Sequence, residues 1–155
     1  MANPNRCRWV ILALAITLLL PPAWLWHNLL SPWGYTAPPG LPTIDPDRQH
    51  RLFVYGTLTQ GWVRWLVTGE EIVSTPARLP GFRREGLDLT AAPTAMTQGE
   101  LLEVSPASLR RLDRYERLGI RYERVRLTLE DGKEAWVYTR IKQPPAEAES
   151  SASNR

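Results

Sequence analysis

The sequence has almost none of the residues that build metal centres or disulfides. Cys7 is the single cysteine among 155 residues, which excludes an internal disulfide and a zinc site made of cysteines. His27 and His50 are the two histidines, and both lie toward the N-terminal segment. That distribution excludes a histidine metal cluster and a Ser-His-Asp hydrolase with ordinary roles. We therefore expect no metal site built on cysteines or histidines.

The chain also lacks a strong excess of charge of either sign. Lys and Arg number 19 against 16 Asp and Glu, and a net charge of +3 is too mild to indicate a protein that binds nucleic acid. With 43% apolar and 23% charged residues, the average composition is that of a folded chain. The distribution is uneven, because no acidic residue precedes Asp45 and four of the seven tryptophans lie in the first 33 positions.

The N-terminal segment has the pattern of a membrane anchor. Arg6 and Arg8 precede a run from Trp9 to Trp26 that contains no charged residue. A helix over that run would be about 27 Å long, enough for a thin hydrocarbon core. Tryptophans at both ends of the run resemble interfacial aromatic belts. We predict an N-terminal transmembrane helix within residues 1–30.

A cleavable signal peptide is the alternative, because the strictly apolar stretch is short and ends before Pro21-Pro22. A cleavage site needs small residues, and Pro21-Pro22-Ala23 has proline where one is wanted, so we prefer an uncleaved anchor. The two prolines should also kink or end the helix. After Arg8 the next basic residue is Arg48, so the positive-inside rule places the rest of the chain on the non-cytoplasmic side, periplasmic or extracellular.

The remaining chain divides by composition into three parts. Residues 31–50 are rich in proline and predict a semi-extended linker. Residues 51–142 hold the apolar runs and are long enough for one core. Residues 143–155 contain no apolar side chain larger than alanine and predict a disordered tail.

Residues 51–142 read as mixed strand and helix. Ser105 and Pro106 form an N-cap and a first helical position, so we predict a helix over 106–116. Trp62 and Trp65 are spaced for a short helix, and we expect both to pack inside. Strands are predicted at 52–55, 71–79, 99–104, 122–129 and 134–139, the last two joined as a hairpin by Asp131-Gly132.

Two places carry residues suited to chemistry. Tyr55, Gly56, Thr57 and Leu58 directly follow the first strand, where a glycine lets the backbone approach a ligand and free N–H groups can bind an anion. An ordinary turn glycine is the alternative reading. No statement about substrate follows from this short motif by itself.

Glu116 is the second place, because it continues the helical spacing of Leu109 and Leu112 and so belongs to the core-facing side. Partial burial there should raise its pKa toward the range useful for proton transfer. A helix-end glutamate paired with an arginine is the alternative. Asp113 leans toward the arginine face, where we expect an ion pair with Arg117.

Taken in order, six motifs resemble the γ-glutamylcyclotransferase-like family (AIG2-like, γ-glutamylamine cyclotransferase-like). They are LFVYGTLTQG at 52–61, ARLPGF at 77–82, GELLEV at 99–104, LDRYE at 112–116, YER at 122–124 and AWVY at 135–138. The resemblance covers essentially all of 51–142. It implies an α+β fold, a small mixed β-barrel with flanking helices. It also implies a pocket over the loop that follows the first strand.

The resemblance further implies an activity. The loop Tyr55–Leu58 and Tyr122 would bind a small-molecule γ-glutamyl substrate, and Glu116 would act as general base and then general acid while the substrate cyclises to 5-oxoproline. One group in both roles implies that neither a metal ion nor a cofactor is needed. The family has glycine after the catalytic glutamate, whereas Arg117 follows here and would lower the pKa of Glu116 if the two paired. A non-catalytic binding module on the same fold, recognising an amino-acid-like ligand, is the second hypothesis. A structural domain with a closed pocket is the third.

Overall fold

The structure is a computed structural model that describes residues 8–9, 17–20 and 35–141. The chain divides into two compact units, Met1–Thr36 and Ala37–Arg155. In the first unit, residues 8–9 and 17–20 are helical. No helix within the described ranges is both long and apolar enough to cross a membrane. Most of the anchor predicted over 1–30, and the tail predicted over 143–155, lie outside the described residues.

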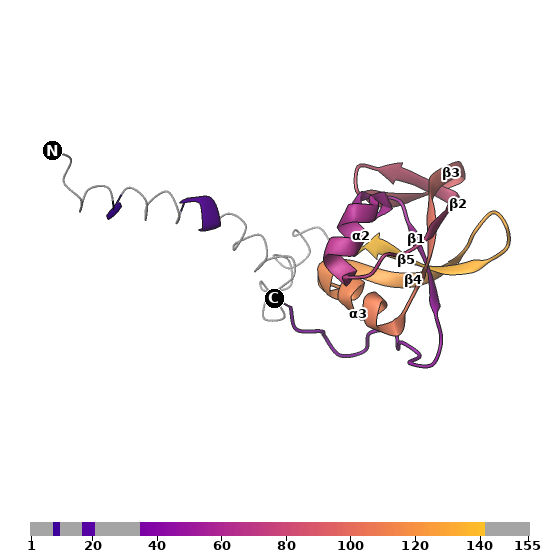
Figure 1. Ribbon diagram of the computed structural model, residues 1–155. Helices are drawn as coiled ribbons and strands as arrows, with labels where there is room; N and C mark the ends of the chain where they lie inside the picture. Colours follow the sequence, from indigo (N-terminus) through magenta and orange to yellow (C-terminus); the bar gives the residue numbers. More distant parts are fainter. Residues whose placement is uncertain (1–7, 10–16, 21–34, 142–155) are drawn as a thin grey trace, which may run out of the picture. The chain divides into compact units, whose positions relative to one another are not determined.

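The second unit is an α+β domain built on one five-stranded sheet (Figure 1). Its elements in chain order are β1 His50–Val54, the 3-10 helix η1 Thr57–Thr59, α2 Gly61–Thr68, β2 Ser74–Glu85, β3 Asp88–Val104, α3 Pro106–Tyr115, β4 Tyr122–Thr128 and β5 Glu134–Arg140. The strand order is β2-β3-β1-β5-β4, and β1 and β5 run parallel while the other neighbours are antiparallel.

The sheet is open, whereas the family resemblance implied a small barrel. β2 and β4 form the two edges and pair with no further strand in the described part of the chain. The edges approach each other at one point, where the N–H of Glu130 donates to the carbonyl oxygen of Arg78 at 3.0 Å. One hydrogen bond does not make a ladder, so the curled sheet stops short of closure.

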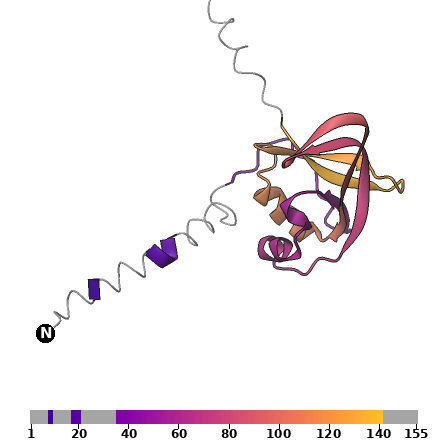
Figure 2. The same ribbon diagram turned by 90° about the horizontal axis from the view of Figure 1, so that it is seen from above.

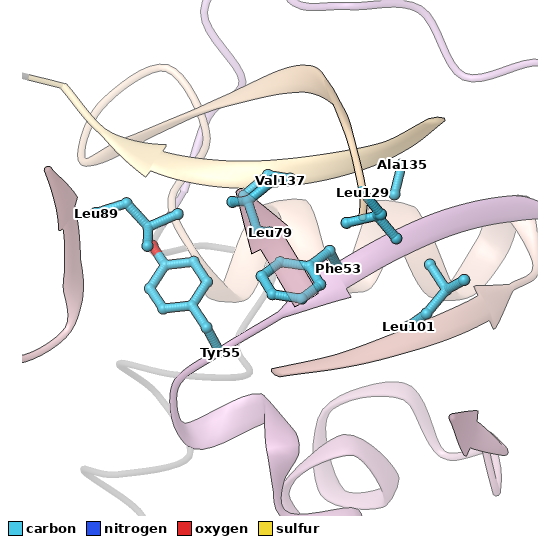
Figure 3. Packing of buried hydrophobic residues seen from close by; sticks show 8 residues of the cluster. All are labelled: Phe53, Tyr55, Leu79, Leu89, Leu101, Leu129, Ala135 and Val137. Carbon is cyan, nitrogen blue, oxygen red and sulfur yellow. The ribbon is translucent and has the colours of Figure 1, made fainter. Parts of the chain in front are cut away.

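β1 is the central strand, and the core packs around it. Leu52 and Phe53 have no exposed surface. Figure 3 shows the cluster on one side of the sheet, which consists of Phe53, Tyr55, Leu79, Leu89, Leu101, Leu129, Ala135 and Val137. Gly99 of β3 faces this cluster, and a Cβ there would lie 2.6 Å from Cζ of Phe53. Only a residue without a side chain permits so close an approach of β3 to the central strand.

α2 and α3 lie side by side on one side of the sheet (Figures 1 and 2). The guanidinium of Arg111 on α3 donates to the carbonyl oxygen of Thr68 at the end of α2. The packing of α2 differs from the expectation, because Trp62 and Trp65 are 68% and 60% exposed. Val63 and Val67 fill the inward side instead, so the two tryptophans occupy the solvent face.

α3 begins as its sequence predicts. The side chain of Ser105 accepts a hydrogen bond from the N–H of Ser108 at 3.1 Å, and Pro106 opens the helix. Leu109 and Leu112 are fully buried, which confirms the predicted inward face. The cap sets where α3 begins, the buried leucines set which side faces the core, and Glu116 lies at the C-terminal end of the helix.

α3 ends in a Schellman motif, in which the N–H of Leu118 donates to Asp113 O at 2.9 Å and that of Arg117 to Arg114 O at 3.0 Å. The motif needs a left-handed residue, and Arg117 supplies it with φ 53°. Glycine meets this requirement without strain, whereas an L-residue with a side chain does not. The departure from the family's glycine therefore leaves the turn intact at an energetic cost.

Part of the predicted linker packs on the domain. A Cβ on Gly119 would lie 2.6 Å from Cγ of Pro38 and 2.8 Å from Cδ2 of Leu41, so these side chains rest on that glycine. The guanidinium of Arg124 donates to the carbonyl oxygen of Pro42 at 2.7 Å. The chain therefore joins the domain beside the turn that follows α3.

Candidate active site

The loop after β1 presents backbone N–H groups. Gly56 precedes η1, and its carbonyl oxygen accepts from the N–H and the hydroxyl of Thr59 at 3.1 and 2.8 Å. Within the described residues, no acceptor takes the N–H groups of Gly56, Thr57 or Leu58. Leu58 is buried and anchors the loop, whereas Thr57 is exposed. The loop is thus a short, fixed set of free donors, which suits an anionic group.

Tyr55 lies between this loop and the core. Its side chain is buried, and its hydroxyl donates to the carbonyl oxygen of Tyr138 at 2.7 Å. Burial raises the pKa of Tyr55 far above its ordinary value, so the phenol remains a neutral donor. The hydrogen bond ties the end of β1 to β5 and holds the start of the loop in place.

Glu116 is the C-cap of α3, and its side chain is half-buried. Burial raises the pKa of Glu116 from 4.5 to about 7, and the positive charge of Arg121 opposes the shift only in part. The Glu116 carboxylate forms no hydrogen bond or ion pair with any described residue, and pairing with Arg117 does not occur. A carboxyl that changes protonation near neutrality is suited to moving protons.

Electrostatic effects place Glu116 among the predicted substrate-binding residues. Its negative charge raises the pKa of Tyr55, after the larger effect of burial. It also raises the pKa of Tyr122, which is half-buried at the start of β4 and again shifted mainly by burial. Such effects require short separations in a poorly solvated region. The charge of Glu116, at the end of α3, therefore acts on Tyr55 at the end of β1 and on Tyr122 at the start of β4.

The turn between β2 and β3 completes the surroundings of the loop. Cδ2 of Leu87 lies 3.7 Å from where a Cβ on Gly56 would be, so the turn reaches the loop. Asp88 pairs with Arg140 at 2.9 Å, which connects the turn to the end of β5. Sequence reasoning did not place Asp88 or Arg140 at the site, and no local pattern signals the pairing of residues 52 positions apart.

Behind Glu116, a buried network fixes α3 to the sheet. Asp113 is buried, accepts a hydrogen bond from the hydroxyl of Tyr138 at 2.6 Å and lies 3.4 Å from Nη1 of Arg124. The expected pairing of Asp113 with Arg117 is wrong. Burial raises the pKa of Asp113, while Tyr138 and Arg124 oppose the shift. Because Asp113 precedes Glu116 by less than one turn, this network positions the Glu116 side chain.

Within residues 35–141 and the two short N-terminal stretches, no three histidine, cysteine or acidic side chains converge as a metal site would require. The polar groups available at the site are therefore the loop donors, two tyrosines and one carboxyl, supported by the charges around Asp88. This set can bind a zwitterionic molecule and exchange a proton with it.

Solved structures with the same fold support this description. A protein from Arabidopsis thaliana, At5g39720.1, is 25% identical, with a TM-score of 0.54 over 66% of this chain and 76% of that one. Another from the same plant, At3g28950.1, is 20% identical, with a TM-score of 0.53 over 72% and 79%. A gamma-glutamyl cyclotransferase is 16% identical, with a TM-score of 0.50 over 61% and 68%. A search of curated proteins finds no match.

A family model decides the relationship. The model described as gamma-glutamyl cyclotransferase, AIG2-like, matches residues 52–154, which is most of the chain and includes the loop, α3 and β4. The motif at 52–61 forms most of β1, the loop after it and the start of α2, and the motif at 112–116 forms the C-terminal end of α3. The chain therefore belongs to the gamma-glutamyl cyclotransferase, AIG2-like family.

Proposed function

We propose that this chain is an enzyme that cyclises a γ-glutamyl amine or γ-glutamyl peptide to 5-oxoproline and releases the amine. The observation that carries the proposal is the Glu116 carboxyl, which is half-buried, unpaired among the described residues and has a pKa of about 7. It lies close to Tyr55, from which the loop of free N–H groups continues. The family membership supplies the reaction class.

In the proposed reaction one carboxyl carries protons from the attacking nitrogen to the departing nitrogen. The Glu116 carboxylate accepts a proton from the α-ammonium group of the substrate, and the resulting amine attacks the γ-carbonyl carbon. A carbon–nitrogen bond forms and closes a five-membered ring, and then the original amide carbon–nitrogen bond breaks. The Glu116 carboxylic acid gives its proton to the departing nitrogen. The ring nitrogen then passes its extra proton through the same carboxyl to the amine, which leaves as an ammonium ion, so the enzyme ends as it began and no water is consumed.

The site's other groups hold the substrate in position. We assign the N–H groups of Gly56, Thr57 and Leu58 to the amino-acid end of the substrate, with Tyr55 and Tyr122 beside it. The nucleophile and the carbonyl belong to one molecule, so most of the entropic cost of bringing them together is already met. Orientation and proton transfer are the remaining tasks. A carboxyl whose pKa lies near the working pH is the best suited to proton transfer.

A screen of γ-glutamyl amines and peptides for 5-oxoproline release by the full chain in detergent tests the proposal. Glu116→Gln should lower turnover by roughly 10²–10⁴-fold, because it removes the proton carrier but keeps the shape. Glu134→Gln is the matched control and should keep full activity, since Glu134 lies at the start of β5 with an exposed side chain.

Two results of the screen would contradict the proposal. Full turnover by the Glu116→Gln variant would remove Glu116 from the mechanism. Binding of a γ-glutamyl compound without any turnover by the wild-type chain would instead support the non-catalytic binding module.

We further propose that residues 1–30 are a single-pass membrane anchor and that the domain lies on the non-cytoplasmic side. The uncharged run from Trp9 to Trp26, its terminal tryptophans and the basic residues before it support this proposal. The enzyme would then act on γ-glutamyl compounds outside the cytoplasm. The orientation is tested by the reporter fusion described in the Discussion.

A further inference from the structure

The solvent face of α2 is apolar. Trp62, Trp65 and Leu66 are 68%, 60% and 44% exposed and follow i, i+3, i+4 spacing, so they form one patch on the helix. The opposite side of α2 already supplies the buried residues, so the domain does not need these three for its own core. Two tryptophans and a leucine together on a surface mark an interaction site.

The neighbouring helix is basic on its exposed side. Arg110 and Arg114 follow i, i+4 spacing on α3, with Arg114 half-buried, and the exposed Arg117 and Arg121 follow in the turn after the helix. Within the described residues, none of these four forms an ion pair with a carboxylate. Arg111 of the same helix is exposed, and its guanidinium donates to the carbonyl oxygen of Thr68 at the end of α2, the helix that carries the apolar patch.

One acidic residue at the C-terminal end of α3, Glu116, interacts electrostatically with Arg121 but forms no ion pair with it among the described residues. Asp113 is buried and engaged by Tyr138 and Arg124. Glu70 lies at the opposite end of α3, where its carboxylate accepts from the hydroxyl of Ser108 at 2.7 Å. The surface of α2 and α3 therefore combines aromatic and aliphatic side chains with unneutralised arginines, which is the composition of helices that lie on anionic membranes.

The N-terminal part of the domain, residues 38–41, lies beside the turn that follows α3. Pro38 and Leu41 pack on Gly119, between Arg117 and Arg121 in the sequence. From Trp26 to this contact only residues 27–37 intervene, and such a stretch spans at most about 40 Å when extended. A chain anchored through residues 1–30 would therefore keep the domain, tethered beside Gly119, within reach of the bilayer.

We propose that the surface formed by Trp62, Trp65 and Leu66 of α2 together with the exposed arginines of α3 docks on an anionic lipid membrane. This inference rests on the proposed anchor, but it is independent of the proposed catalysis. Docking holds one side of the domain against the headgroups. Because Glu116 lies at the end of α3, docking brings the candidate active site to the membrane surface. The substrate would then be taken up next to the bilayer.

The test uses the full chain with Cys7→Ser, in vesicles of phosphatidylcholine mixed with an equal amount of phosphatidylglycerol. The environment-sensitive dye NBD is attached at Leu66→Cys, or at Asp131→Cys as the matched control. Asp131 belongs to the turn between β4 and β5, which points away from both helices in the two views (Figures 1 and 2). Nitroxide-labelled lipid should quench the dye at position 66 and leave it unquenched at position 131.

Reversing the charge of the arginines is a second test, because docking through hydrophobic contacts alone would not depend on their charge. Each basic residue near an anionic surface accounts for roughly fivefold in the ratio of docked to undocked domain. Arg110→Glu together with Arg117→Glu should lower that ratio by at least about 25-fold. A thermal melt of the double variant, compared with wild type, shows that the domain remains folded.

Flotation separates the anchor from the docking. If the chain floats with vesicles and position 66 behaves like position 131, the anchor stands and the docking is refuted. If the dye at position 66 is shielded from water but is not quenched by the labelled lipid, a second copy of the chain or its own N-terminal segment covers the surface. That result also refutes membrane docking. If the dye at position 66 is quenched equally in pure phosphatidylcholine vesicles and in the anionic vesicles, and charge reversal does not change the quenching, the arginines have no role in docking. A chain that does not float at all overturns the anchor and the docking together.

Discussion

Replacing Glu116 by glutamine should make the domain more stable at neutral and alkaline pH. Burial raises the pKa of the Glu116 carboxyl from 4.5 to about 7, so the folded state prefers the protonated form. The stability from this preference is fully present below about pH 4.5 and is lost as the pH rises through about 7. Glutamine resembles the protonated carboxyl at every pH and therefore avoids the loss.

The size of the effect follows from the shift. One pKa unit corresponds to about 1.4 kcal/mol, so a shift from 4.5 to about 7 amounts to at most about 3.5 kcal/mol. The carboxyl is still half-exposed, which reduces the value, and we expect about 1–3 kcal/mol. The variant and the wild type should be nearly equal in stability near pH 4.5, and the advantage of glutamine should grow up to about pH 8.

Denaturant unfolding of both chains at a series of pH values measures the difference directly, since the other titrating groups cancel. Glu134→Gln serves as the control and should differ from wild type by a small amount that does not rise through neutral pH, because this exposed carboxylate pairs only with Arg126 at 3.9 Å. A constant difference between Glu116→Gln and wild type from acid to alkaline pH would refute the reasoning, because it would mean that Glu116 is solvated like an ordinary glutamate.

Arg117→Gly should stabilise the domain by about 1 kcal/mol, since glycine accepts the left-handed turn at φ 53° without strain. The control Arg114→Gly, inside α3, should destabilise by a similar amount, and denaturant unfolding that ranks the two alike would contradict this account. For the orientation, a periplasmic-type reporter fused after Lys142 should be active only outside the cytoplasm, and cytoplasmic activity would overturn the proposed topology.

Local signals in the sequence predicted the elements whose ends they specify. Ser105 and Pro106 placed the start of α3, and Asp131-Gly132 placed the final hairpin, in which Gly132 has φ 79°. β2 and β3 extend well beyond the predicted segments, to Glu85 and back to Asp88. The prolines and glycines in that region obscure the alternation, and the long pairing of the two strands, which no local pattern encodes, holds them in place.

Periodicity identified Glu116 but misjudged its neighbours. Leu109, Leu112, Asp113 and Glu116 follow i, i+3, i+4, i+7 spacing, so the sequence did contain a signal that Asp113 faces inward. Its partners come from β4 and β5, and a charge is buried only where such partners exist. Arg124 is buried for the same reason.

The exposed tryptophans of α2 show the converse limit. Helical spacing identified the amphipathic pattern but could not tell which of two apolar sides would face the core. Val63 and Val67 occupy the inward side, which leaves Trp62 and Trp65 outside. Tertiary packing decides such a choice, and here it produces a surface that the fold itself does not use.

The pH dependence of kcat/KM for 5-oxoproline release tests the central claim most directly, because it reports the protonation of the essential base in the free enzyme. With a γ-glutamyl substrate found in the screen, kcat/KM should rise about tenfold per pH unit on the acid side and level off above about pH 7, where Glu116 is ionised. A profile that is already level from about pH 5 would contradict the account, because the group that moves the proton would then have an ordinary carboxyl pKa.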